Sequence, residues 1–226
     1  MTNGGHNLAA VVFDLDGVLI ESEPLWAETR REVTLAAGGH WPDEAVRRMQ
    51  GMSSSEWSAY MHDELDVADA PERIVEVVVE RMAEALRRRL PLLPGAREAV
   101  GRIAACWPLA IASSSNRPLI KLVLDLASLR PHFAAIVSSE EVARGKPAPD
   151  VYLEAAARLG VDAQRCVAIE DSSNGLRSAH AAGMGVIAVQ STTYPAAADA
   201  LALAADVVHA LDQLTVERVR RAAPTA

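Results

Sequence analysis

The sequence predicts an α/β protein, a doubly wound parallel sheet with a second, smaller all-helical domain. Residues 8–13 form a continuous apolar run rich in valine, typical of a strand buried on both faces of a parallel sheet. Residues 24–89 carry helical patterns and no strand-like run. From residue 96 onward helix and strand patterns alternate, as βαβ crossovers require.

Helix start and stop signals divide the segment after the first strand into helices. Proline suits a first helical turn, because it lacks the amide hydrogen that this turn leaves unpaired, and glycine suits the end. The signals are Pro24 with Gly38-Gly39, Pro42-Asp43, the serines at 53–55, and Pro71 with the arginines at 87–89. We therefore expect residues 22–91 to form the helical domain, and residues 1–21 and 92–226 to form the α/β core.

The second half of the chain supplies the other predicted core elements. Helices are expected at 96–105, 118–126, 150–159 and 176–182, and strands at 109–112, 135–137, 166–169 and 186–189. A short apolar step at 206–208 and a final helix follow.

Composition and charge exclude several classes of function. The chain has 226 residues, a formal net charge of −8 and 4% aromatic residues. Its field repels polyanions and acidic membrane surfaces, so we expect no nucleic acid and no membrane as partners. No basic-then-apolar leader and no long apolar run is present, which predicts a cytoplasmic protein. The oligomeric state is not readable from the sequence, and a monomer is compatible with it.

Polar clusters follow the predicted strands at their carboxyl ends. They are Asp14 and Asp16, the run from Ser113 to Asn116, Lys146, and Glu170-Asp171. In open α/β sheets ligands bind at this edge, so we expect the clusters to share one crevice. Lysine is rare here, because Lys121 and Lys146 are the only two in the chain.

The clusters suit phosphoryl transfer. Asp14, Glu170 and Asp171 offer carboxylate oxygens for Mg2+, which would offset the repulsion between Asp14 and Asp16. Lys146, the Ser113 hydroxyl and the N–H groups that follow it can hold a phosphate. Asp14 would then attack phosphorus and Asp16 would transfer protons.

Each cluster also has a structural interpretation. Ser113 could cap a turn, and Lys146 could be a solvated loop residue. Glu170-Asp171 could cap a helix that starts near Asn174.

The motifs DLDGVL, the strand-end Ser113, GKPAPD and IEDSSNG together resemble the four motifs of the haloacid dehalogenase (HAD) superfamily, in its phosphatase branch. The resemblance implies a Rossmann-like core and a mobile helical cap after the first strand. It implies Asp14 as the nucleophile and Asp16 as the general acid and base that also offers its backbone carbonyl to Mg2+. By the same resemblance Ser113, Ser114 and Lys146 are phosphate ligands, and Asp171 is a metal ligand with Glu170 alongside.

Three activities within or beside this family compete. A dehalogenase has no use for a proton-transferring Asp16. A β-phosphoglucomutase-like sugar phosphomutase resembles the core, but where it has a cap histidine and a cap arginine this chain has Trp26 and, after Gly51, Ser54. A non-catalytic phosphometabolite-binding protein would be expected to have lost the nucleophile.

The stretch ESEPLW is similar to sugar-phosphate phosphatases, so we expect a small phosphorylated metabolite as substrate. We expect Trp26, Gly51, Ser54 and Asn116 to contact it. Residues 52–57 and Arg47 or Arg48 are expected to face the leaving group.

Overall fold

The computed structural model describes residues 8–49, 52–190 and 195–224, and its centre is a parallel sheet of six strands in the order β3-β2-β1-β4-β5-β6. Every neighbouring pair is parallel, which confirms the predicted sheet. The strands are β1 (Ala10–Phe13), β2 (Leu109–Ser113), β3 (Phe133–Ser138), β4 (Cys166–Glu170), β5 (Gly185–Val189) and β6 (Asp206–Val208).

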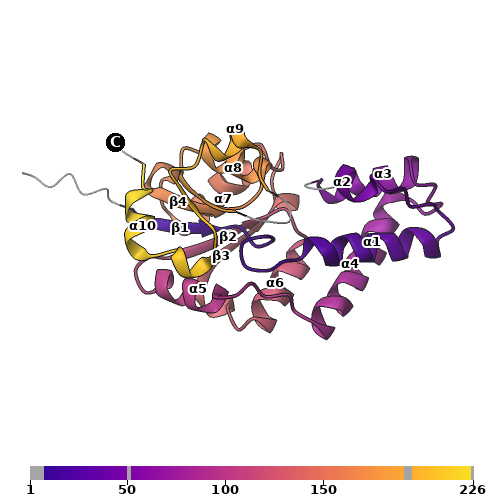
Figure 1. Ribbon diagram of the computed structural model, residues 1–226, viewed down its shortest axis with the longest axis horizontal. Coiled ribbons are helices and arrows are strands. Elements are labelled where there is room, and N and C mark those ends of the chain that lie inside the picture. Colours follow the sequence, from indigo (N-terminus) through magenta and orange to yellow (C-terminus); the bar gives the residue numbers. More distant parts are fainter. Residues whose placement is uncertain (1–7, 50–51, 191–194, 225–226) are drawn as a thin grey trace, which may run out of the picture.

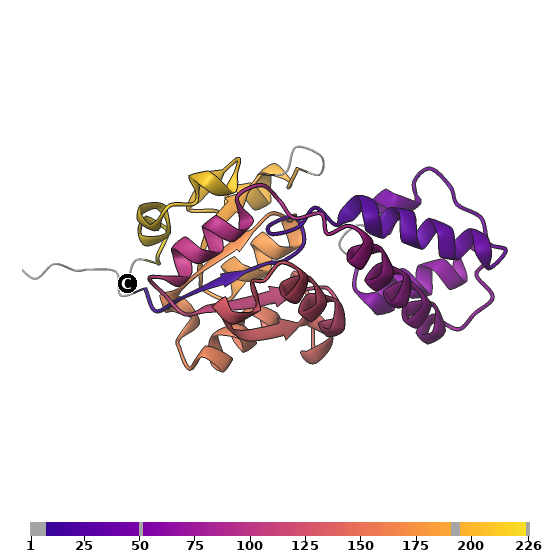
Figure 2. The same ribbon diagram turned by 90° about the horizontal axis from the view of Figure 1, so that it is seen from below.

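Helices cover both faces of the sheet, as Figure 2 shows. Side chains alternate along β1, so Val11 and Phe13 join one core cluster while Ala10 and Val12 join the other. The first cluster includes residues of α5 (Ala96–Ala104), α6 (Arg117–Leu126) and α10 (Val216–Arg221). The second includes residues of α7 (Asp150–Leu159), α8 (Ser173–Ala181) and α9 (Ala198–Leu201).

Four further helices lie between β1 and α5, on the side where β1 ends (Figure 1). They are α1 (Glu23–Ala36), α2 (Ala45–Met49), α3 (Ser54–Asp63) and α4 (Pro71–Arg88), and we call them the helical insertion. Ser53 and Glu56 form a capping box at the start of α3. One face of α4 is buried at a spacing of four residues, through Ile74, Val78, Met82 and Leu86, as an amphipathic helix requires.

The two connections between the insertion and the sheet run side by side. The Glu21 N–H donates to the Pro91 carbonyl at 2.8 Å, and the Leu93 N–H donates to the Leu19 carbonyl at 2.9 Å. Ile20 and Leu92 form an antiparallel bridge between them. This paired crossing connects the insertion to the sheet.

Most predicted element bounds agree with the structure to within two residues. The start of α8 differs more, because the Ser172 hydroxyl accepts the Gly175 N–H and begins the helix at Ser173. In the part of the chain that the structure describes, none of the helices combines the length and the apolar character that crossing a membrane would need.

Candidate active site

A pocket of about 300 Å3 lies at the carboxyl ends of β1 and β4. β1 pairs with β2 on one side and with β4 on the other, so the strand order reverses here, and such a point is where open α/β sheets bind ligands. The lining includes five of the predicted site residues: Asp14, Asp16, Ser114, Lys146 and Asp171. Glu23 and Arg47 of the helical insertion also line the pocket.

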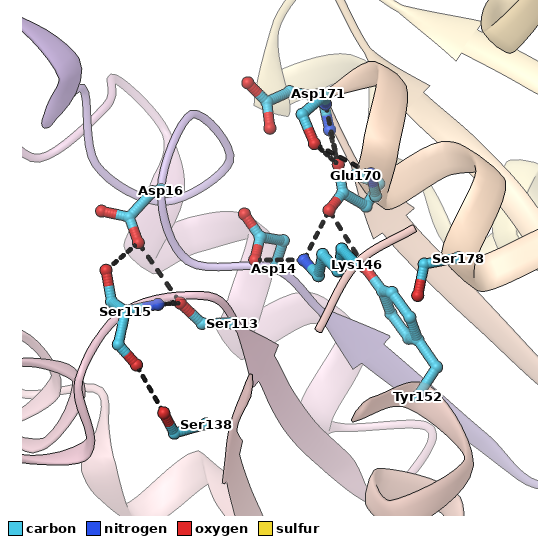
Figure 3. Close-up of polar contacts among 12 residues, drawn as sticks. Asp14, Asp16, Ser113, Ser115, Ser138, Lys146, Tyr152, Glu170, Asp171 and Ser178 are labelled. Atoms are coloured by element: carbon cyan, nitrogen blue, oxygen red, sulfur yellow. Dashed lines mark hydrogen bonds and ion pairs between the residues drawn. The ribbon is translucent and has the colours of Figure 1, made fainter. Parts of the chain in front are cut away.

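Lys146 joins the ends of two strands (Figure 3). Its Nζ donates to Asp14 Oδ1 at 2.8 Å and to Glu170 Oε1 at 2.6 Å, and the lysine side chain is 5% exposed. The Tyr152 hydroxyl of α7 donates to the same Glu170 oxygen at 3.2 Å. On the loop that carries Lys146, the Ala148 carbonyl accepts the Ser178 hydroxyl of α8.

Glu170 is held at both carboxylate oxygens. Its Oε1 contacts Lys146 and Tyr152, while its Oε2 accepts the N–H groups of Asp171 and Ser172, each at 2.7 Å. A Cβ at Gly175 would lie 1.6 Å from Oε1, so only glycine lets α8 pass this close. The sequence predicts Glu170 as a metal ligand, and in the structure its carboxylate contacts Lys146 while a carboxylate oxygen stays within 4.8 Å of those of Asp14 and Asp171.

The electrostatics of the site are dominated by buried carboxyl groups. Burial is the main reason that the pKa of Asp14 is raised to about 8. Lys146 lowers this pKa, while the charges of Glu170 and Asp16 add to the increase. Burial, Glu170 and Asp14 likewise raise the pKa of Asp171 well above its usual value. Burial alone would lower the pKa of Lys146, but Asp14 and Glu170 outweigh it and hold that pKa well above 10.5.

The donor set fits a hard divalent cation. Asp14, Glu170 and Asp171 each offer a carboxylate oxygen, and these atoms lie within 4.8 Å of one another. Oxygen ligands of this kind favour Mg2+ over zinc, and a cation would offset the repulsion that raises the pKa values of Asp14 and Asp171. Gly17 lies directly against Asp171 and has a φ of 79°. A Cβ at this position would lie 1.9 Å from Asp171 Oδ2, so only glycine fits here.

Asp16 points away from this carboxylate cluster and into a group of hydroxyls (Figure 3). Its carboxylate accepts the hydroxyls of Ser22, of Ser113 at 3.3 Å and of Ser115 at 2.7 Å. The Ser138 hydroxyl at the end of β3 donates to the Ser115 carbonyl at 2.8 Å. The predicted phosphate ligand Ser113 is thus fully buried against Asp16, whereas Ser114 faces the pocket.

The other residues predicted to contact substrate lie in different environments. Trp26 is 7% exposed and packs against Trp57 with ring centroids 6.3 Å apart, so its position is that of a core residue. The Asn116 amide donates to the Ser54 hydroxyl at 3.2 Å, which links α3 to the start of α6. Gly51 lies outside the described residues.

Of the two arginines expected near the leaving group, Arg47 lines the pocket, while Arg48 stacks over Tyr60 with its guanidinium carbon 5.1 Å from the ring centroid.

Three residues that contact the carboxylates of the site received no role from the sequence, although Ser115 stands in the polar run from Ser113 to Asn116. Tyr152 and Ser115 contact Glu170 and Asp16 respectively, and Ser22 contacts Asp16 from the start of the insertion. Ser115 had a usable signal, because it stands two residues after Ser113 at a strand end. Tyr152 had none, since its position on α7 matches that of an ordinary core residue.

The fold and the site define an α/β enzyme with a carboxylate and lysine centre at the strand ends. The family model for haloacid dehalogenase-like hydrolases matches residues 8–183, and the chain belongs to this family. Hexitol phosphatase B of Escherichia coli K12 is 37% identical over 196 residues, which cover 81% of this chain and 84% of that protein.

Two solved structures extend the likeness. CbbY from Rhodobacter sphaeroides, in complex with phosphate, has a TM-score of 0.84 at 27% identity and covers 94% of this chain and 99% of its own. A putative β-phosphoglucomutase from Thermotoga maritima has a TM-score of 0.74 at 30% identity and covers 93% of this chain and 98% of its own.

Proposed function

We propose that the chain is a Mg2+-dependent phosphomonoester hydrolase that acts on a small phosphorylated metabolite, a sugar phosphate, through an aspartyl-phosphate intermediate. The observation that carries this proposal is the buried contact of Lys146 with Asp14 at the pocket floor, with Asp171 beside them. Family membership and the printed name of the hexitol phosphatase support the same class of reaction.

The proposed reaction has two displacements. Asp14 attacks phosphorus in line, the bond to the leaving oxygen breaks, and Asp16 gives that oxygen a proton. Asp16 then takes a proton from water, whose oxygen attacks the aspartyl-phosphate and releases phosphate with Asp14 restored. Lys146 and Ser114, which line the pocket, would hold the phosphoryl oxygens, and Ser113 would join them if its hydroxyl turned away from Asp16.

Asp14, Asp171 and the backbone carbonyl of Asp16 would hold Mg2+, with Glu170 alongside. The ion supplies positive charge that offsets the charge of the carboxylates and of the phosphoryl group.

We further propose that residues 22–91 form a cap domain and that residues 1–21 and 92–226 form the catalytic core. The paired crossing at Ile20 and Leu92 supports this division. Arg47, which lines the pocket from the insertion, supports a role of the cap in leaving-group recognition. Ser54 and Asn116 could contact substrate if the hydrogen bond between them breaks. Substrate contact by Trp26 and Gly51 stays a prediction.

The test is hydrolysis of p-nitrophenyl phosphate and of sugar phosphates with and without Mg2+. Asp14→Asn keeps the shape of the side chain but removes the nucleophile, so we expect its rate to fall by several orders of magnitude. Chelation of the metal should abolish the wild-type activity. A fully active Asp14→Asn enzyme would contradict the assignment of Asp14 as the nucleophile.

Assays of the purified wild-type chain also distinguish two alternative functions, a sugar phosphomutase and a non-catalytic binding protein. Formation of glucose 6-phosphate from β-glucose 1-phosphate, faster than release of phosphate, would show the mutase. Binding of phosphorylated metabolites with no turnover of any ester would show a non-catalytic binding protein.

A further inference from the structure

Arg30 of α1 is a buried cation whose side chain has no hydrogen-bond partner among the described residues. It is 8% exposed, and its Nε is one of two buried side-chain polar atoms that the described part of the chain leaves unpaired. Burial lowers its pKa to about 10, against the opposing effect of Glu23 and Asp16. A buried charge without a hydrogen-bond partner is unfavourable, so a stable chain keeps one where a ligand or a function compensates it.

Two tryptophan rings fix the plane of the Arg30 guanidinium. Its carbon lies 4.8 Å from the ring centroid of Trp26 and 5.1 Å from that of Trp57. Contacts with ring faces stabilise the cation but leave its in-plane N–H groups without acceptors. The guanidinium therefore keeps free hydrogen-bond donors inside the insertion.

Arg30 lies on the helix that begins beside the catalytic pocket. Side chains on a helix lean toward its N-terminus, and α1 begins beside the pocket with Glu23, which stands two turns before Arg30 on the same face. The influence of Glu23 and Asp16 on its pKa agrees with this direction. Trp26, which contacts the guanidinium, also lines a narrow cavity with Asp16.

We propose that Arg30 is a specificity-determining residue that donates hydrogen bonds to hydroxyl oxygens of an uncharged, polyhydroxylated leaving group. The inference rests on the proposed phosphatase function and adds the residue that selects the leaving group. A hydroxyl both accepts and donates hydrogen bonds. Arg30 can therefore donate to a substrate hydroxyl, and the Glu23 carboxylate can accept a hydrogen bond from it. A second anionic group on the substrate would meet the carboxylates of Glu21 and Glu23, which line the same pocket.

The test compares Arg30→Met with wild type on substrates that differ only in the leaving group. The pair is a six-carbon alditol 6-phosphate and hexyl phosphate, which has the same chain length without hydroxyls. We expect kcat/KM for the alditol phosphate to fall by about 10- to 100-fold, the effect of losing a hydrogen bond from a charged group. Hexyl phosphate should change by less than about threefold, and Arg30→Lys should recover part of the loss.

Arg31→Met is the matched control, because Arg31 is exposed on the same helix and should leave both substrates unaffected. The thermal midpoint of Arg30→Met should equal or exceed that of wild type, because the change removes an unpaired buried charge. Equal losses on both substrates, or no loss on either, would overturn the proposal. So would an Arg30-dependent preference for a sugar bisphosphate or a phosphorylated aldonate over the alditol phosphate.

Failure of the proposed function itself looks different. In that case the wild-type chain hydrolyses neither ester. If only the inference fails, the wild-type chain still hydrolyses both esters, and Arg30→Met does not change their relative kcat/KM values.

Discussion

Replacing Lys146 with alanine tests whether the phosphate site is on the correct loop. In the structure its Nζ reaches Asp14 at 2.8 Å and Glu170 at 2.6 Å, and both carboxylates are buried. Each charge-assisted hydrogen bond that the ammonium makes in the transition state contributes about 1.5–3 kcal/mol. Losing one or two of them predicts a fall in kcat/KM on the order of a hundredfold or more, since about 1.4 kcal/mol corresponds to tenfold.

The assay is steady-state hydrolysis of one substrate by Lys146→Ala, Lys121→Ala and wild type. Lys121 is the matched control as the other lysine of the chain, and it is exposed on α6. Asp125 stands four residues after Lys121, but no ion pair joins these two described residues. We expect Lys121→Ala to stay within about threefold of wild type.

Circular dichroism melts accompany the rates, because removing one partner of a buried ion pair can cost about 3–5 kcal/mol of stability. Rates are compared at a temperature where both variants are folded. Equal losses for the two variants, or a larger loss at Lys121, would refute the reasoning.

Two further predictions concern the aspartates of the first motif. Asp16→Asn should retain substrate binding but turn over slowly, with a smaller loss for p-nitrophenyl phosphate, whose leaving group needs no proton; an identical loss for good and poor leaving groups would contradict the acid role. The metal-free chain should lose stability as the pH rises from about 4 toward 8, because folded Asp14, with its pKa raised from 3.8 to about 8, keeps a proton that the unfolded chain releases. Melts across this range should show a loss of up to ~1 kcal/mol per pH unit, reduced in Asp14→Asn and by added Mg2+, and a midpoint independent of pH would contradict it.

Local chemistry made most of the fold predictable from the sequence. Pro71 and the closing arginines bracket α4 because proline fits a first turn and basic side chains favour the carboxyl end of a helix. The bounds of α7 and β6 agree with the predicted ranges, since apolar periodicity and flanking turn residues coincide there. The position of the polar clusters at strand ends follows from parallel topology alone.

The unpredicted part of the site depends on contacts between residues far apart in the chain. Tyr152 contacts Glu170 across α7 and β4, and the sequence pattern of α7 is that of any core helix. Glu170 stays a predicted metal ligand, but its contacts with Lys146 and with the backbone N–H groups after β4 could not be read from the sequence pattern. Arg30 stands among charged residues of an amphipathic helix, and only its burial between two tryptophans distinguishes it.

The balance of charge at the strand ends is consistent with the proposed metal and phosphorylated ligand. Asp14, Asp171 and Glu170 lie together with Lys146 as the cation among them, so the cluster carries excess negative charge when all are ionised. A phosphate monoester adds further negative charge, and Lys146 is already engaged with two carboxylates. In the proposed reaction, Asp14 and Asp171 would hold a divalent cation whose charge would offset this excess and lower the pKa of Asp14, and Lys146 would then be available to the phosphoryl group. On this proposal we expect metal binding to precede productive substrate binding, and discrimination between substrates would depend on residues of the insertion such as Arg47 and Arg30.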